Sequence, residues 1–226
     1  MKNTSGSSRL FFQCLFFIGL CSGVGISTAA EQKQQRMEVD ISQVSDWNGF
    51  SEALFALHKK RMQGREIKTT EHTGGYGGRL GEADFYKEIS YIDADTGRLL
   101  SKIQWEREHP DTIHTIEVFI YDNAGRVTRD FLAAYLPWSR NAPVQTLINL
   151  HYYNGELHGF RQFDASGERI YEQCSGKSAG EDVFISLEDY ELNTSPDRRP
   201  HIMSTRMYEA CFGDLQKTAG AYTTPQ

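Results

Sequence analysis

Alternation of apolar and polar residues dominates the chain after residue 85 and predicts a series of β-strands. Leu99, Ile103 and Trp105 would share one face of a strand, and Ile116 and Val118 begin a similar stripe. A period of two is typical of a strand with one buried face. The further runs that we expect to be strands cover residues 85–91, 127–133, 146–153, 157–163, 168–174, 182–192 and 201–211.

Short turns separate most of these runs, so neighbouring strands should pair antiparallel. An open sheet of about nine strands is expected to curl or split. The sequence therefore predicts a mainly β fold, an antiparallel meander of about nine strands that forms a curved sheet or partly open barrel. One α-helix should precede it.

That helix is predicted for residues 46–62, because its apolar residues recur at helical spacing. Ser45 or Asp46 can cap its start and Gly64 can end it. We expect the apolar stripe to dock on the sheet. Its members are Trp47, Phe50, Leu54 and Leu57.

A turn motif recurs within the sheet: an aromatic residue, an Asx-type turn and a glycine precede a resumed alternating run. Copies lie at residues 91–99, 121–127 and 163–170, and a shorter form lies at 153–157. The second copy, Tyr-Asp-x-x-Gly-Arg-Val, resembles the YD (Rhs-type) hairpin repeat of bacterial secreted and surface proteins. The shorter form, read as YNGELHG, is similar to MORN-like hairpins.

The resemblance covers at most residues 85–175 and implies a binding surface or shell, with no catalytic residues to carry over. The copies are unevenly spaced along the chain, whereas the units of a true repeat array keep a fixed period. We therefore interpret them as similar corners of one sheet.

The shorter copy also predicts a register. If Asn154 and Gly155 form a two-residue type I′ turn, His151 lies directly opposite His158. Two imidazoles so placed could share a metal ion, but no third ligand is identifiable in the sequence. A mild pH response of the pair is the alternative. We expect no metal or other cofactor and keep His151 and His158 as a weak candidate pair.

The first thirty residues predict a cleaved secretory signal peptide. Lys2 and Arg9 precede a short apolar core, and small residues before Ala30 suit a signal peptidase. A transmembrane anchor is disfavoured because the apolar stretch is too short to cross a bilayer. A lipid anchor on Cys21 is disfavoured because bulky Leu20 precedes it. We expect no stable membrane insertion after cleavage.

The rest of the chain divides into a flexible lead-in at 31–43, a single β-rich domain at 44–217 and a frayed tail at 218–226. After removal of residues 1–30, the 196 remaining residues carry 22 basic and 30 acidic side chains, a net charge of −8. This charge disfavours nucleic acid as a partner. Cys174 and Cys211 remain, and a disulfide between them is the expectation for an exported protein.

Candidate chemistry is sparse. Residues 176–180 match the G-x-S-x-G pattern, but a predicted strand follows where a nucleophile elbow needs a helix. Three aromatic residues stand out as binding candidates: Trp105, Trp138 and Tyr153. We expect no enzyme and identify no catalytic residue.

Two function classes remain. The first is a periplasmic or secreted, non-catalytic interaction protein of the bacterial envelope, which binds an envelope protein or a glycan through a sheet face and its hairpin turns. The alternative is a periplasmic carrier of an apolar ligand, because a helix followed by a long meander looks like the half-open barrels of lipoprotein carriers. A carrier needs an empty apolar concavity, whereas an interaction protein should have a filled core and exposed aromatic residues.

Overall fold

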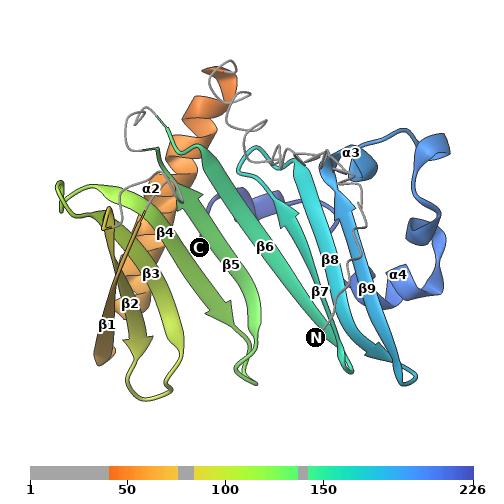
Figure 1. Cartoon of the computed structure of the whole chain (residues 1–226), viewed down its shortest axis with the longest axis horizontal. Helices are drawn as coiled ribbons and strands as arrows, with labels where there is room; N and C mark the ends of the chain where they lie inside the picture. Colours follow the sequence, from red (N-terminus) through yellow and green to blue (C-terminus); the bar gives the residue numbers. More distant parts are fainter. Residues whose placement is uncertain (1–40, 76–83, 137–141) are drawn as a thin grey trace, which may run out of the picture.

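The structure, a computed structural model, describes residues 41–75, 84–136 and 142–226, with side chains from residue 44 onward. Nine strands form a single sheet in the order of the sequence, and each pairs antiparallel with the next (Figure 1). They are β1 (Ile67–Gly74), β2 (Tyr86–Asp93), β3 (Leu99–Glu106), β4 (Ile113–Tyr121), β5 (Val127–Ala134), β6 (Gln145–Asn154), β7 (Leu157–Phe163), β8 (Arg169–Ser178) and β9 (Glu181–Glu188).

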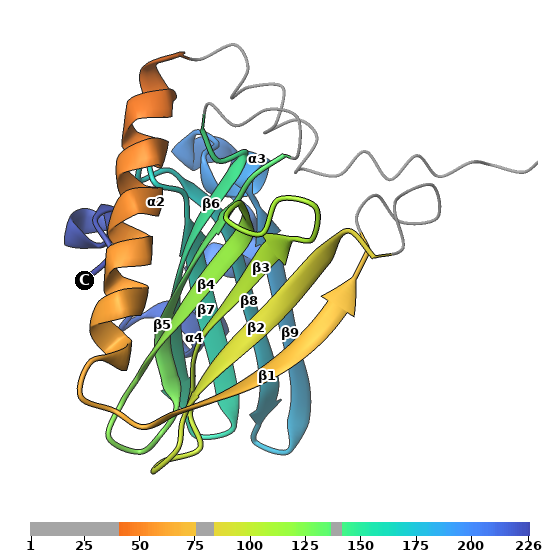
Figure 2. The same cartoon turned by 90° about the vertical axis from the view of Figure 1, so that its left-hand side faces the viewer.

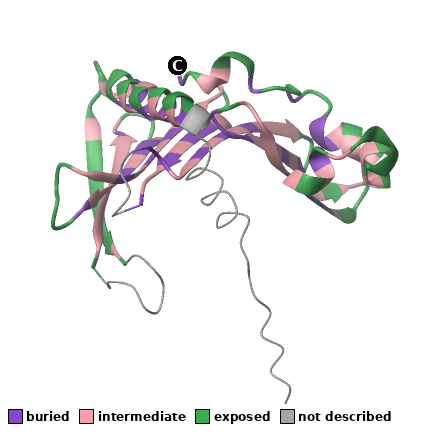
Figure 3. Ribbon diagram, turned by 90° about the horizontal axis from the view of Figure 1, so that it is seen from above, coloured by how far each residue is buried: buried purple, intermediate pink, exposed green. Residues whose placement is uncertain are grey.

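The predicted mainly β antiparallel meander with one N-terminal helix is confirmed. The sheet stays open and does not curl into a barrel, since β1 and β9 each pair on one side only. In Figures 2 and 3 the two edges of the sheet lie farther from the long helix than its central strands do.

The long helix α2 (Ile41–Met62) packs its apolar stripe on the central strands, as predicted. Trp47, Phe50 and Leu54 are almost fully buried, and the ring of Phe50 meets that of Phe131 edge-on, with centroids 6.2 Å apart. Burial of each such side chain contributes about 2–3 kcal/mol. The helix starts five residues earlier than predicted, because Val44 extends the same stripe by one turn.

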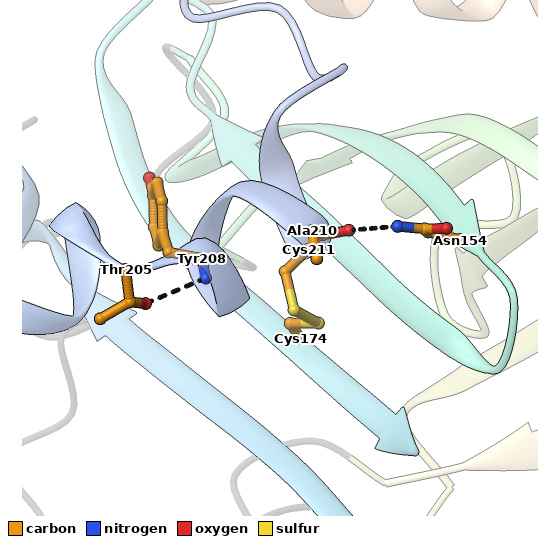
Figure 4. The surroundings of a disulfide bond; sticks show 6 residues. All are labelled: Asn154, Cys174, Thr205, Tyr208, Ala210 and Cys211. Carbon is orange, nitrogen blue, oxygen red and sulfur yellow. Dashed lines mark hydrogen bonds between the residues drawn. A yellow bond between two sulfur atoms is a disulfide. The ribbon is translucent and has the colours of Figure 1, made fainter. Parts of the chain in front are cut away.

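The predicted number of strands is right, but one observed strand was not predicted and one predicted strand is not a strand. β1 was not predicted, because its side chains are mostly exposed and show no apolar alternation. Conversely, the strand predicted for residues 201–211 is wrong. That segment contains a 3₁₀ turn, η3 (His201–Ser204), and the helix α4 (Arg206–Phe212). Thr205 caps α4, since its hydroxyl accepts the amide hydrogen of Tyr208 (Figure 4).

The segment after β9 also departs from the expected strand, which was extended to residue 192. A short helix, α3 (Asp189–Leu192), ends it, and a 3₁₀ turn, η2 (Pro196–Arg198), follows. The chain then reaches α4, which packs on β6 and β7. The predicted disulfide is present: Cys174 of β8 is bonded to Cys211 of α4, with both side chains fully buried (Figure 4).

Gly159 makes this docking possible. A Cβ atom at that position would overlap the backbone carbonyl of Cys211. Asn154 adds a hydrogen bond from its side-chain amide to the carbonyl of Ala210, at 3.0 Å (Figure 4). The C-terminal segment is therefore fixed on the β6–β7 hairpin by close backbone approach as well as by the covalent bond.

A buried ionic cluster fixes the same segment. Glu172 of β8 is fully buried and accepts from Arg161, Arg169 and the hydroxyl of Tyr208. Arg161 also donates to the backbone carbonyls of residues 215 and 216, both at 2.8 Å. The paired charges satisfy one another, which a buried ion requires.

The last residues also differ from the expected frayed tail. They form a 3₁₀ turn, η4 (Gly220–Thr223), and Ala219 is buried in the core. The guanidinium of Arg129 lies 4.1 Å above the ring centroid of Tyr222. This cation–π contact joins the tail to β5. The predicted signal peptide and most of the lead-in lie outside the described residues.

The recurring motif builds the same corner three times. Asp93, Asp122 and Asp164 each accept, through a side-chain oxygen, a backbone N–H two to four residues later. The glycine of each copy has a positive φ, between 69° and 85°. These contacts explain why an Asx residue and a glycine recur in each turn, with the glycine four residues after Asp93 and three residues after Asp122 and Asp164.

Candidate functional site

The two faces of the sheet are unequal, and this difference defines the candidate site. Every strand residue of the buried core cluster points to the side on which α2 and α4 pack, as the strand pairings show. We call the opposite side the open face. Its central part, on β5–β8, carries amides, imidazoles and rings. Its chemistry-bearing residues are Asp130, Asn149, His151, Tyr153, His158, Phe160, Gln162 and Tyr171.

Five residues of this face form a line across five strands, from β4 to β8. Phe119 pairs with Asp130, Asp130 with Asn149, Asn149 with Gln162, and Gln162 with Tyr171. We call this line the cross-strand row. It spans about 19 Å, since adjacent strands lie about 4.8 Å apart.

The three polar members of the row are hydrogen-bonded to one another. Asn149 Nδ2 donates to Asp130 Oδ1 at 2.7 Å, and Gln162 Nε2 donates to Asn149 Oδ1 at 2.8 Å. Each amide nitrogen keeps a second hydrogen, and the carbonyl of Gln162 keeps its acceptor sites. The row is thus fixed in orientation while its outer donors and acceptors remain usable.

A second chain of hydrogen bonds meets the row at Asp130. His151 Nε2 lies 2.5 Å from Asp130 Oδ2, and His151 Nδ1 lies 3.0 Å from His158 Nε2. A carboxylate only accepts, so His151 carries a proton on Nε2. A single proton between His151 Nδ1 and His158 Nε2 then joins the two rings. Burial, and then the neighbouring His151, lower the pKa of His158. The neutral form of His158 is therefore favoured near pH 7.

The predicted opposition of His151 and His158 is wrong in register. His151 pairs with Phe160, and Tyr153 pairs with His158. Gly155 alone has a positive φ, of 60°, so Gly155 and Glu156 occupy the turn, as in type II′ hairpins with glycine first. The shift amounts to two residues, which keeps every side chain on its predicted face. The histidines are consequently diagonal neighbours and still meet.

No group of three or more His, Cys, Asp or Glu side chains in the described ranges is arranged to hold a metal ion. The histidine pair supplies two nitrogens, and its third neighbour, Asp130, binds the far side of His151. In metalloproteins such a carboxylate orients a ligating histidine rather than binding the metal.

The two aromatic candidates among the described residues lie on opposite faces of the sheet. Tyr153 lies on the open face, where it stacks on His158 with centroids 4.6 Å apart and lies 4.9 Å below the guanidinium of Arg126. Trp105 points to the opposite, core side. Trp138 lies outside the described residues.

Trp105 lines a groove of about 490 Å³ on the core side, over β2 and β3. Ile89 and Tyr91 form its floor with the indole ring, and Lys87 and Arg107 are among its polar residues. Burial raises the pKa of Tyr91, and a hydrogen bond from Trp105 offsets part of that rise. Trp105 is thus a candidate that lines a concave site.

The sequence did not single out Asp130, Asn149 or Gln162, because amides and carboxylates are common on any polar strand face. A signal was present nonetheless. Each residue stands at a position that the strand alternation assigns to the face away from the core. The strand register places Asp130 opposite Asn149, and Asn149 opposite Gln162. A register worked out across all hairpins would have found the row.

The fold and the site define a class: an open, single-sheet antiparallel β protein with one covered face and one polar–aromatic face. No known family model matches this chain, and neither a curated protein nor a solved structure is found to be similar to it. Within the described part of the chain, none of the helices has the length and apolar character that crossing a bilayer demands.

Proposed function

We propose that this chain is an exported, non-catalytic interaction protein of the bacterial envelope that binds its partner on the open face. One observation carries the proposal: a single sheet has one side covered by α2 and the C-terminal segment, and the other side retains an ordered polar row between aromatic rings. Hydrogen-bonding groups fixed before binding lose little entropy when a partner arrives.

Exposed aromatic area supports the same surface. Phe184 of β9 pairs with Ser175 and lies on the open face, where its side chain is 70% exposed. Phe160 of β7 lies beside Tyr171, the last member of the row, with ring centroids 5.7 Å apart. Aromatic residues at the surface are typical of protein and ligand interfaces.

We propose a non-catalytic role although His151 and Asp130 have the contact of an acid–base pair. Enzymes enclose such groups in a cleft, and the groove lined by Trp105 lies on the opposite, core side of the sheet. Export is proposed from the predicted signal peptide together with the disulfide, because disulfides persist in oxidising compartments.

The test compares two exposed aromatic residues. Protein purified from its own envelope fraction is analysed by native mass spectrometry as wild type, Phe184→Ala and Tyr190→Ala. Tyr190 is 77% exposed but lies on α3. We expect a retained envelope component in wild type and Tyr190→Ala, and its loss in Phe184→Ala. Equal retention in all three, or no retained component, would contradict the proposal.

A carrier of an apolar ligand is the second candidate, and the groove lined by Trp105 is the observation that favours it. The filled contact between α2 and the sheet counts against a large internal cavity at that place, since Trp47 and Leu54 are buried there. A lipid retained by wild type and lost in Trp105→Ala would favour the carrier.

A further inference from the structure

We propose that the cross-strand row binds a neutral, extended β-1,4-linked glycan that runs across the strands, one sugar ring per strand. This rests on the proposed function, whose binding surface it specifies. The inference follows from the spacing, the hydrogen-bonding chemistry and the charge of the row.

The spacing matches an extended sugar chain. The row places one side chain on each of five adjacent strands, at intervals of about 4.8 Å. The rise per residue of an extended β-1,4-linked glycan is close to this interval, so successive sugars would meet successive strands. An α-1,4-linked glucan curls and loses that match after one or two residues.

The chemistry of the row suits hydroxyl groups. A sugar hydroxyl both donates and accepts, and so does a primary amide. Asn149 and Gln162 each retain a second amide hydrogen after their mutual bond. Asp130 is buried, and its two oxygens accept from Asn149 and His151, so it orients the row. Phe119 and Tyr171 place an aromatic ring at either end of the row, which suits the apolar C–H surface of a pyranose. Lys102 Nζ lies 5.6 Å from the ring centroid of Phe119.

The charge of the row favours a neutral ligand. Asp130 is its single formal charge and is already held by Asn149 and His151. The nearest ion pair on the face, Lys102 with Glu117, is internally compensated at 3.5 Å. An anionic polymer would find no uncompensated cation on the row, and a cationic one would have to displace His151 from Asp130.

The experiment is an NMR titration of the purified protein with cellohexaose, chitohexaose and maltohexaose. The side-chain amide signals of Asn149 and Gln162 report directly on the row. We expect one of the two β-1,4-linked hexasaccharides to shift them, with maltohexaose binding at least several-fold more weakly. Tyr171→Ala should raise the Kd about five- to tenfold through loss of its ring. Tyr171→Phe and the distant Tyr190→Ala should leave it within twofold.

Absence of shifts at these amides with both β-1,4-linked sugars overturns the inference, as does equal binding of maltohexaose. Tyr171→Phe separates the ring from the hydroxyl, because it keeps the ring and removes the hydroxyl that donates to Gln173 and lies 2.9 Å from Ser186 Oγ. If the open face retains an envelope protein in the mass-spectrometric test while no glycan shifts the row, the proposed function stands and this inference fails. If neither occurs, both fail.

Discussion

Acidification should destabilise the protein through His58, a buried histidine on α2. Its side chain is 4% exposed, its Nδ1 lies 2.8 Å from the hydroxyl of Ser101, and its ring meets Tyr91 edge-on. Burial, with a smaller contribution from Lys59, lowers its pKa from 6.5 to about 4. The unfolded chain therefore takes up this proton first as the pH falls below 6.5.

The sign of the effect follows from linkage. Stability that depends on neutral His58 is complete above pH 6.5 and is lost progressively as the pH falls toward 4. If the full pKa difference of His58 between the folded and unfolded states applied, the free energy of unfolding would be lower by about 2 kcal/mol at pH 5. Screening by solvent reduces this, so we expect a loss of about 1–2 kcal/mol between pH 7.5 and 5.

The assay is urea unfolding of wild type, His58→Gln and His72→Gln at pH 7.5 and 5. Gln at position 58 can keep a hydrogen bond to Ser101 and does not titrate. We expect the pH-dependent loss of unfolding free energy to shrink by about 1–2 kcal/mol in His58→Gln. The control His72→Gln, on the exposed edge strand β1, should show the same loss of unfolding free energy as wild type. Equal losses in all three proteins would refute the reasoning.

Three further predictions concern the C-terminal segment. Glu172→Gln should lower the free energy of unfolding by about 3–5 kcal/mol, because the buried Arg161 and the partly exposed Arg169 lose their counter-ion. A change of less than about 1 kcal/mol in urea unfolding would contradict this. Gly159→Ala should displace α4 and lower Tm, whereas Gly49→Ala, where a Cβ meets nothing within 4 Å, should raise stability by up to about 1 kcal/mol. Loss of the disulfide in a Cys174→Ala, Cys211→Ala double variant should cost about 4 kcal/mol for a loop of 37 residues in the chain-entropy model, and calorimetry that shows an unchanged Tm would count against it.

Much of the sheet was readable from the sequence because one of its faces is buried. Strands such as β4 and β7 alternate between buried and half-buried side chains, and this is the pattern that period-two analysis detects. β1 escaped prediction for the opposite reason: as an exposed edge strand it has no apolar face to reveal it. Pairing with β2, rather than its own composition, makes it a strand.

Two errors came from local signals with more than one interpretation. Asn154 and Gly155 suit a type I′ turn, but Gly155 also suits the first central position of type II′, which leaves Asn154 free to reach Ala210. Residues 201–211 contain enough apolar residues to suggest a strand, but Met207 and Cys211 are spaced by four, and Thr205 caps the helix. The candidate row on the open face needed the complete register, which no single hairpin supplies.

Because the sheet has two free edges, related sequences can differ in the number of strands. A closed barrel fixes its strand number, because adding a strand changes its radius and every neighbouring contact. Here β1 is paired on one side and exposed along most of its length, so a hairpin gained or lost at that end would leave β4–β8 unaltered. The opposite end is held by the disulfide and Glu172. Relatives should therefore differ in length at the β1 edge while keeping the anchored half constant.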